Sequence, residues 1–176
     1  MPGKAIGIEL NLGYPGTVSR SVDAIITPKV IKSDVTSGKE TELPIAFGEP
    51  VVLNADNTYS RFATDSTADK FIGIAVREIK QATDYYSASG EYLPNEVCDV
   101  LNRGSIMVLC NNGTPTAGGK VYIRIKENVS VPNGVIGQFE AVADGENTVE
   151  IPNLKWTTGK KDSNNVAEIT VLTRTI

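Results

Sequence analysis

The residue types that most often perform catalysis are sparse in this chain of 176 residues. It contains no histidine, so the commonest general base and the commonest metal-binding side chain are both missing. The two cysteines, Cys98 and Cys110, are too few to build a structural zinc site without further soft ligands. The sequence therefore predicts no histidine-activated nucleophile and no zinc centre.

A glycine-rich stretch from Gly113 to Lys120 has the composition of a phosphate-binding loop but not its spacing. The residue that follows Gly118 is Gly119 where the loop needs lysine, and Lys120 is followed by Val121, which cannot reach magnesium through a hydroxyl group. A glycine turn that opens a strand accounts for this segment.

The carboxylates are scattered along the chain. Asp56, Asp65 and Asp69 lie in one polar stretch, and Glu91 and Glu96 lie in another. A pair of catalytic acids for glycoside hydrolysis also needs an aromatic-lined cleft, and aromatic residues make up only 6% of the chain. None of these stretches matches a calcium-binding loop. We therefore predict that the protein is not an enzyme and has no metal site and no cofactor.

The elements that would position any site are strands, because the apolar residues recur with a period of two. In 121–126 the apolar residues alternate with Tyr122, Arg124 and Lys126, and in 167–172 Ala167, Ile169 and Val171 alternate with the residues between them, which is typical of half-buried strands. The 16 glycines and 9 prolines punctuate the chain at turn positions, and short strands separated by such turns favour a barrel or sandwich. We predict an all-β fold with a single β-barrel or β-sandwich body.

Eight strands are predicted, and two connections between them can be described. The strands are 50–53, 71–79, 97–101, 105–110, 120–126, 138–143, 148–157 and 166–174. Residues 144–147 would close a hairpin, and residues 158–165 are polar enough to form an exposed loop. Gly104 is either a tight turn or a bulge in one bent strand, and the sequence leaves both open.

The first 44 residues differ from the rest, because prolines interrupt every apolar run. We predict an extended N-terminal arm (1–44) that precedes the barrel or sandwich body (45–176). The arm keeps one alternating apolar stripe, which could lie on its own body or on a neighbour. The stripe consists of Val18, Val22, Ala24 and Ile26.

Aromatic residues offer two further candidates for recognition. Tyr85, Tyr86 and Tyr92 lie in a polar connection, where they could form an interface or cover the end of a barrel. Trp156 lies on a predicted strand, so we expect it in the core, with ligand stacking as the alternative.

The charge and hydropathy of the chain limit its partners. A net charge of −4 disfavours nucleic acid, and no apolar run approaches the ~20 residues that span a bilayer. The N-terminus lacks the apolar region of a secretory signal, so we expect synthesis in the cytosol and reduced, buried cysteines.

Five blocks of this sequence, in their order and spacing, resemble the structural cement (capsid decoration) proteins of tailed bacteriophages. The likeness runs from about residue 13 to residue 125. The blocks are 14–26, which begins Tyr-Pro-Gly-Thr-Val, 45–53, 71–77, 92–108, which contains Arg103-Gly104, and 118–123, which begins Gly-Gly-Lys.

The resemblance implies a β-barrel or β-tulip-like body with an extended arm. Such proteins bind the outer surface of an expanded head and bridge neighbouring major capsid protein subunits, often as trimers or dimers. It therefore implies a homo-oligomer on the exterior of the virion, made in the host cytoplasm. No residue role carries over from this family, because its contacts are surfaces. Our candidates for partner binding, taken from the residues themselves, are Tyr14, Val18, Val22, Ala24, Ile26, Tyr85, Tyr86 and Tyr92.

Three other functions remain open from the sequence. A receptor- or glycan-binding β module of a phage tail or baseplate would gather Trp156 and the tyrosines on one exposed face. A small β-barrel enzyme would need two carboxylates in one cleft. A tail-tube or head–tail joining protein would form rings by itself.

Overall fold

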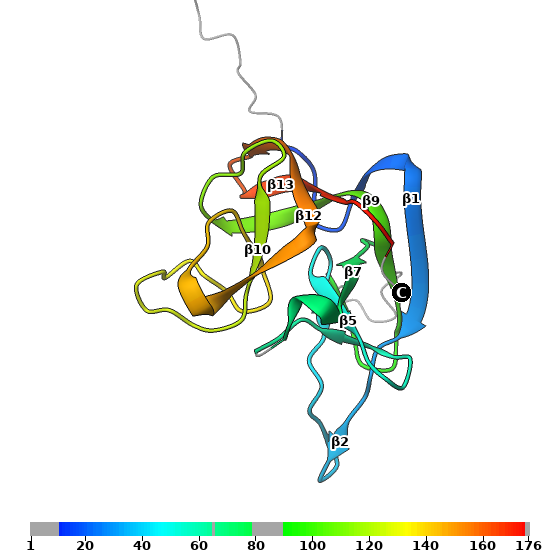
Figure 1. Ribbon diagram of the computed structural model, residues 1–176. Coiled ribbons are helices and arrows are strands. Elements are labelled where there is room, and N and C mark those ends of the chain that lie inside the picture. Colours follow the sequence, from blue (N-terminus) through cyan, green and yellow to red (C-terminus); the bar gives the residue numbers. More distant parts are fainter. Residues whose placement is uncertain (1–10, 65, 79–89, 175–176) are drawn as a thin grey trace, which may run out of the picture.

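The computed structural model describes residues 11–64, 66–78 and 90–174, and almost all regular structure within them is β-strand (Figure 1). The two helices, η1 (Ala68–Lys70) and η2 (Gly145–Asn147), are single 3-10 turns. The predicted all-β class is confirmed. Within the described ranges no helix has the length and apolar character needed to cross a membrane.

Three strands are long (β1, β9 and β12), and the others have two to six residues. The strands in chain order are β1 (Val18–Val30), β2 (Val35–Thr36), β3 (Lys39–Glu40), β4 (Ile45–Ala46), β5 (Pro50–Leu53), β6 (Tyr59–Arg61), β7 (Phe71–Ala75), β8 (Glu91–Tyr92), β9 (Val97–Asn112), β10 (Lys120–Arg124), β11 (Phe139–Glu140), β12 (Thr148–Lys161) and β13 (Val166–Val171).

The C-terminal half of the chain forms a closed barrel. Antiparallel pairing runs from β9 through β13, β12 and β10 to β11, and β11 returns to β9 by a parallel pairing of Phe139 with Cys110. A sheet that closes on itself has no free edge within the ring. The alternation predicted for 121–126 and 167–172 places Val121, Ile123 and Ile169 inside this barrel, all without solvent exposure.

A second layer of strands extends from the other half of β9. There β9 pairs with β7, β7 with β5, and β5 with β6. A parallel bridge between Ile31 and Tyr59 links β6 back to the end of β1. This layer encloses its own cluster of buried side chains, which includes Ile45, Tyr92 and Val100.

Because β9 serves both layers, it must bend, and the bend occurs at Gly104. This residue has a φ of +118°, and a Cβ placed on it would approach the Cα of Ala24 to 3.1 Å. The pairing of β1 with β9 changes register on both sides of this point. Residues 21–24 of β1 lie opposite Gly104, so the extra residues of this irregularity are in β1. Gly104 lies within one continuous strand and is not a turn, and the predicted strands 97–101 and 105–110 are a single strand.

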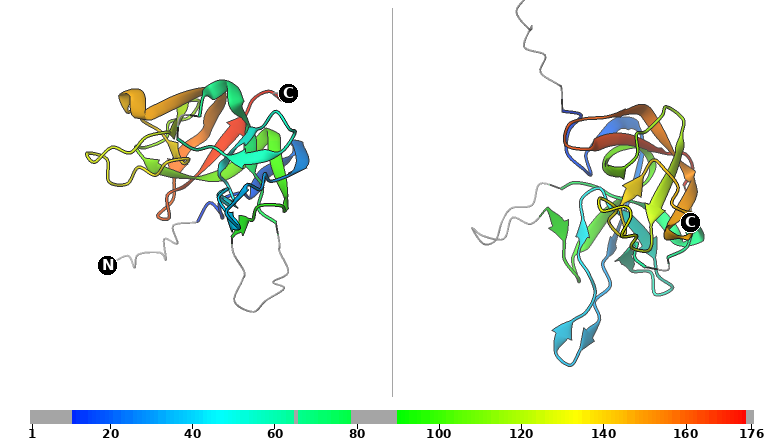
Figure 2. Two further views of the ribbon diagram at one scale, coloured as in Figure 1. Left: turned by 90° about the horizontal axis from the view of Figure 1, so that it is seen from below. Right: turned by 90° about the vertical axis from the view of Figure 1, so that its left-hand side faces the viewer.

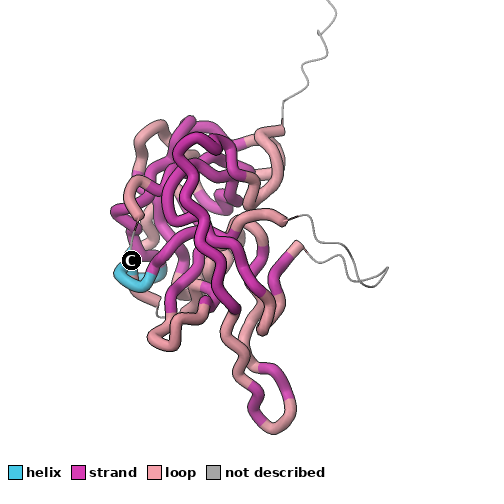
Figure 3. Tube along the Cα trace, turned by 90° about the vertical axis from the view of Figure 1, so that its right-hand side faces the viewer, coloured by secondary structure: helices cyan, strands magenta, loops and turns pink. Residues whose placement is uncertain are grey.

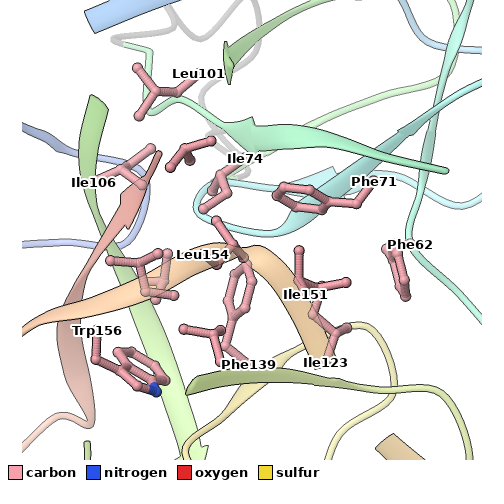
Figure 4. Packing of buried hydrophobic residues seen from close by; sticks show 14 of the residues in the cluster. Phe62, Phe71, Ile74, Leu101, Ile106, Ile123, Phe139, Ile151, Leu154 and Trp156 are labelled. Atoms are coloured by element: carbon pink, nitrogen blue, oxygen red, sulfur yellow. The ribbon is translucent and has the colours of Figure 1, made fainter. Parts of the chain in front are cut away.

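The larger cluster of buried side chains fills the interior of the barrel and extends to β7 (Figure 4). Ile74 and Leu101 contribute from one side, and Phe139, Leu154 and Trp156 contribute from the other. Trp156 is 1% exposed, which confirms the expected core position. Both cysteines are buried and free, as expected.

Two predicted connections are wrong. Residues 144–147 do not join a hairpin, because β10 lies between β11 and β12 in the sheet. The loop predicted at 158–165 is shorter, because β12 continues to Lys161 and pairs there with Ala167. The polar residues at the end of β12 project beyond the barrel, where a strand needs no apolar side chains.

The predicted arm contains regular structure that the sequence did not reveal. Residues 18–30 form β1, which runs antiparallel to β9 of the same chain. Ile31 is buried in the smaller cluster. Beyond it, β2 and β3 form a hairpin that protrudes from the rest of the chain (Figure 2). Residues 18–31 of the predicted arm therefore lie on the body of their own chain.

Candidate interaction surface

The buried carboxylates of the described chain are each paired with an arginine. Glu49 lies 2.9 Å from Arg61, and Glu168, 4% exposed, lies 3.2 Å from Arg20. Burial raises the pKa of Glu49, while the charge of Arg61 opposes that rise. These acids connect strands to one another, and no group of three potential metal ligands occurs among the described residues.

The most buried of these pairs holds two loops in place. Arg124 and Glu140 have no solvent exposure, and Arg124 Nη1 also lies 2.9 Å from Asp144 Oδ2. Asn128 donates to both carboxylate oxygens of Asp144, and this bond, followed by the contact with Arg124, lowers the pKa of Asp144. Gly134 packs against the guanidinium group, since a Cβ there would lie 2.3 Å from Arg124 Nε. No sequence signal identified this network, because its members lie on different elements.

Tyr14 is a surface residue held by a single contact. Its side chain is 67% exposed, and the guanidinium carbon of Arg77 lies 4.3 Å from the centre of its ring. This cation–π contact joins the segment before β1 to the segment after β7. The ring retains most of its area for contact with another molecule.

The predicted stripe does not lie on one face of β1. Val18 and Ala24 are half-buried and pack against the larger core cluster. Val22 is fully exposed and Ile26 is 43% exposed. The register changes between Arg20 and Ile26 place the four side chains of the stripe on different faces, because a bulge reverses the face on which the following side chains lie. The stripe thus supplies two anchoring residues and two exposed ones.

The second half of β1 has a free outer edge, and Figure 3 views the molecule from the side of β1. Among the described strands, only β9 pairs with β1. Ile31 N donates to Glu96 O, so alternation turns the backbone groups of residues 26, 28 and 30 away from β9. The side chains at these three positions are exposed as well. Pro28 has no N–H to offer at this edge, which interrupts any continuous pairing with another strand.

Of the three tyrosines in the polar connection, the structure describes only Tyr92. Tyr85 and Tyr86 lie outside the described residues. Tyr92 is fully buried, and its hydroxyl group donates to Val76 O at 2.7 Å. Its ring meets that of Phe47 edge to face, with 5.2 Å between their centres. Tyr92 therefore packs in the smaller core cluster of its own chain, so its prediction as a partner-binding residue is wrong: a neighbouring Phe47 and the Val76 carbonyl take up the ring and hydroxyl group that the sequence assigned to an interface or to the end of a barrel.

The protruding hairpin and the residues after it expose apolar side chains that are not among the candidates for partner binding predicted from the sequence. Val35 is 60% exposed and Leu43 is 53% exposed. The carboxylate of Glu40 accepts hydrogen bonds from the Ser33 hydroxyl group and from the backbone N–H of Asp34. These bonds hold the base of the hairpin, so its tip projects in a defined direction.

Comparison with known proteins shows which family and which solved structure this chain resembles. Residues 3–171 match the family model described as XM1 gp53 minor capsid protein. A chain of a solved structure, described as the capsid of Myoviridae phage XM1, has the same fold with a TM-score of 0.69. The two sequences are 15% identical, and the match covers 97% of each chain. No curated protein matches the sequence.

Proposed function

This chain belongs to the XM1 gp53 minor capsid protein family, and from that premise we propose that it is a cement protein of a phage head. In this proposal it binds the outer surface of the expanded head and bridges neighbouring major capsid protein subunits. It also contacts further copies of itself, as a trimer or dimer. The family match carries the proposal, because it spans nearly the whole chain and describes a capsid component.

Binding of this kind would stabilise the head by linkage. A protein that binds the expanded shell and not its separated subunits shifts the equilibrium toward the assembled shell. If one molecule touches two subunits, the second contact is intramolecular and gains from a high effective concentration. Two contacts of modest affinity then act as a tight clamp.

The exposed half of the β1 stripe is the surface that we assign to the capsid contact. Val22 and Ile26 are apolar and exposed, Ile26 is paired with Leu101 of β9, and Val22 lies between the paired residues Arg20 and Ile25. A held backbone loses little entropy when its side chains are covered. Because Pro28 interrupts the free edge, side-chain burial rather than a continuous backbone ladder would provide the affinity.

A receptor- or glycan-binding role in a tail or baseplate has less support. That alternative relied on Trp156 and the tyrosines sharing an exposed face. Trp156 and Tyr92 are both buried, so neither can stack on a sugar ring at the surface of this chain.

The experiment is a binding assay between the purified protein and phage heads that lack it. Val22→Asp and Ile26→Asp place charges at exposed positions, so the melting temperature should be unchanged. Each should weaken head binding at least about tenfold, because a charge replaces apolar area at the contact. Val129→Asp is the matched control, since Val129 is 99% exposed but lies on the loop after β10.

Two outcomes would contradict the proposal. If the unsubstituted protein does not bind heads, the cement function is wrong. If Val22→Asp and Ile26→Asp bind as tightly as Val129→Asp, the assignment of the capsid contact to β1 is wrong.

A further inference from the structure

A polar cavity opens at the end of the second strand layer, between β1, β6 and β9. Its volume is about 170 Å³, and Lys29, Tyr59, Asn102 and Arg174 contribute to its lining. A single water molecule needs only ~10–15 Å³ of such space, so the cavity accommodates a larger group.

One atom of the buried Asn102 side chain, which lines the cavity, lacks a hydrogen-bond partner among the described residues. Asn102 is 2% exposed, and its side-chain N–H donates to Ile72 O at 2.9 Å. Its Oδ1 atom accepts no hydrogen bond from any described residue. The Tyr59 hydroxyl group, which lines the same cavity, is the neighbouring polar group of this amide. Asn102 is therefore a polar part of the cavity wall, and its side-chain amide can report on a group that enters the cavity.

The charged groups of the cavity are both cationic. Lys29 donates to Asn57 Oδ1, and neither Lys29 nor Arg174 forms an ion pair with any described residue. Among the residues that the structure describes, no acidic residue lines the cavity. In a protein with a net charge of −4, two cations without acidic partners in this described part of the chain favour an anionic ligand.

We propose that this cavity binds an Asp or Glu side chain of a neighbouring capsid subunit. The carboxylate would lie between Lys29 and Arg174, with Asn102 in the wall of the cavity beside it. The identity of the partner rests on the proposed function, whereas the chemistry rests on the cavity.

The test is an NMR titration of the isolated, isotope-labelled protein with two short peptides. The probes are N-acetyl-Gly-Asp-Gly-amide and N-acetyl-Gly-Asn-Gly-amide, which differ only in the charged group. The aspartate peptide should shift the side-chain amide signals of Asn102 and bind at least about tenfold more tightly, because charge-assisted hydrogen bonds are stronger than neutral ones.

Variants separate the cavity from general surface charge. The double variant Lys29→Gln/Arg174→Gln should lose the response, whereas Lys39→Gln, on the protruding hairpin, should retain it. Both substituted side chains of the double variant reach solvent at the opening, so the fold should tolerate them. Equal binding of the two peptides, no response to either, or a response that survives in the double variant would overturn the proposal.

The titration uses no phage heads, so it fails or succeeds separately from the cement function. If the β1 variants abolish head binding while neither peptide shifts Asn102, the cement function stands and the cavity assignment falls. If the aspartate peptide binds at Asn102 but the protein does not bind heads, the cavity is a carboxylate site and its capsid partner is wrong.

Discussion

Arg124 and Glu140 face each other in a two-pronged ion pair, with 2.5 Å from Nε to Oε1 and 3.0 Å from Nη2 to Oε2. Neither side chain is exposed to solvent. The pair lies where β10 meets β11, the two-residue strand that closes the barrel. So short a strand forms few backbone bonds, and the buried pair strengthens the closure.

Removing one member of this pair should destabilise the protein strongly. Arg124→Met leaves the Glu140 carboxylate buried without its cation, and we expect a loss of about 3–5 kcal/mol in the free energy of unfolding by urea. The double variant Arg124→Met/Glu140→Leu removes both charges and should recover most of that loss. Lys120→Met is the control, because solvent screens the exposed Lys120–Glu150 pair and it should contribute little to stability. A loss no larger than that of the control would contradict a structural role for the buried pair.

Gly48 should tolerate alanine much less well than Gly38, although both have a similar left-handed backbone. Their φ angles are +81° and +76°. A Cβ on Gly48 would lie 2.7 Å from the backbone nitrogen of Gly16, whereas one on Gly38 meets no atom within 4 Å. Both substitutions carry the backbone strain of about 1–2 kcal/mol. Gly48→Ala should add about 1–3 kcal/mol of overpacking, which parallel urea denaturation curves would measure. Equal losses would show that the segment before β1 yields easily at this crossing.

The protruding hairpin should loosen as the pH falls. The pKa of Glu40 is lowered from its usual 4.5, chiefly by the Ser33 hydroxyl group and then by backbone N–H bonds. A lowered carboxyl pKa means that the stabilisation is present above the usual value and is lost as the pH falls through the folded value. The amide signals of Asp34 and Thr41 should therefore move toward random-coil positions below about pH 4. In Glu40→Gln the same signals should show no such transition; a transition that persists would assign it to another acid.

The thiol of Cys110 should be unreactive in the native protein. Burial raises its pKa to about 11, so roughly one molecule in a thousand carries the thiolate at pH 8. Iodoacetamide at that pH should leave Cys110 unmodified in native buffer and should alkylate it in urea. Peptide mass mapping distinguishes it from Cys98, which is also buried. Stoichiometric alkylation under native conditions would show that this end of β9 opens readily.

Local pattern was sufficient for one strand of the second layer and for two strands of the barrel. The prediction for 50–53 coincides with β5, and those for 120–126 and 166–174 begin at the first residues of β10 and β13. Alternation works there because one face of each strand meets the core, so burial imposes a period of two on the side chains. The usual burial of tryptophan placed Trp156 in the core.

The pattern was not sufficient for β1. Its apolar residues alternate as if they shared a face, yet Ala24 is half-buried while Val22 is fully exposed. The bulges that separate them arise where β1 follows the bend of β9 at Gly104. That bend is imposed by a partner strand some eighty positions away, and no local spacing contains it.

The sequence by itself determined the β class, the alternation of inward and outward side chains, and the lack of histidine chemistry, because these depend on residue type and near neighbours. Only the tertiary structure decided that Arg124 meets Glu140, that Tyr92 is buried, and that Lys29, Asn102 and Arg174 border one cavity. Such meetings depend on strand order and on how β9 bends, which are set by the packing of the whole chain and not by any one segment.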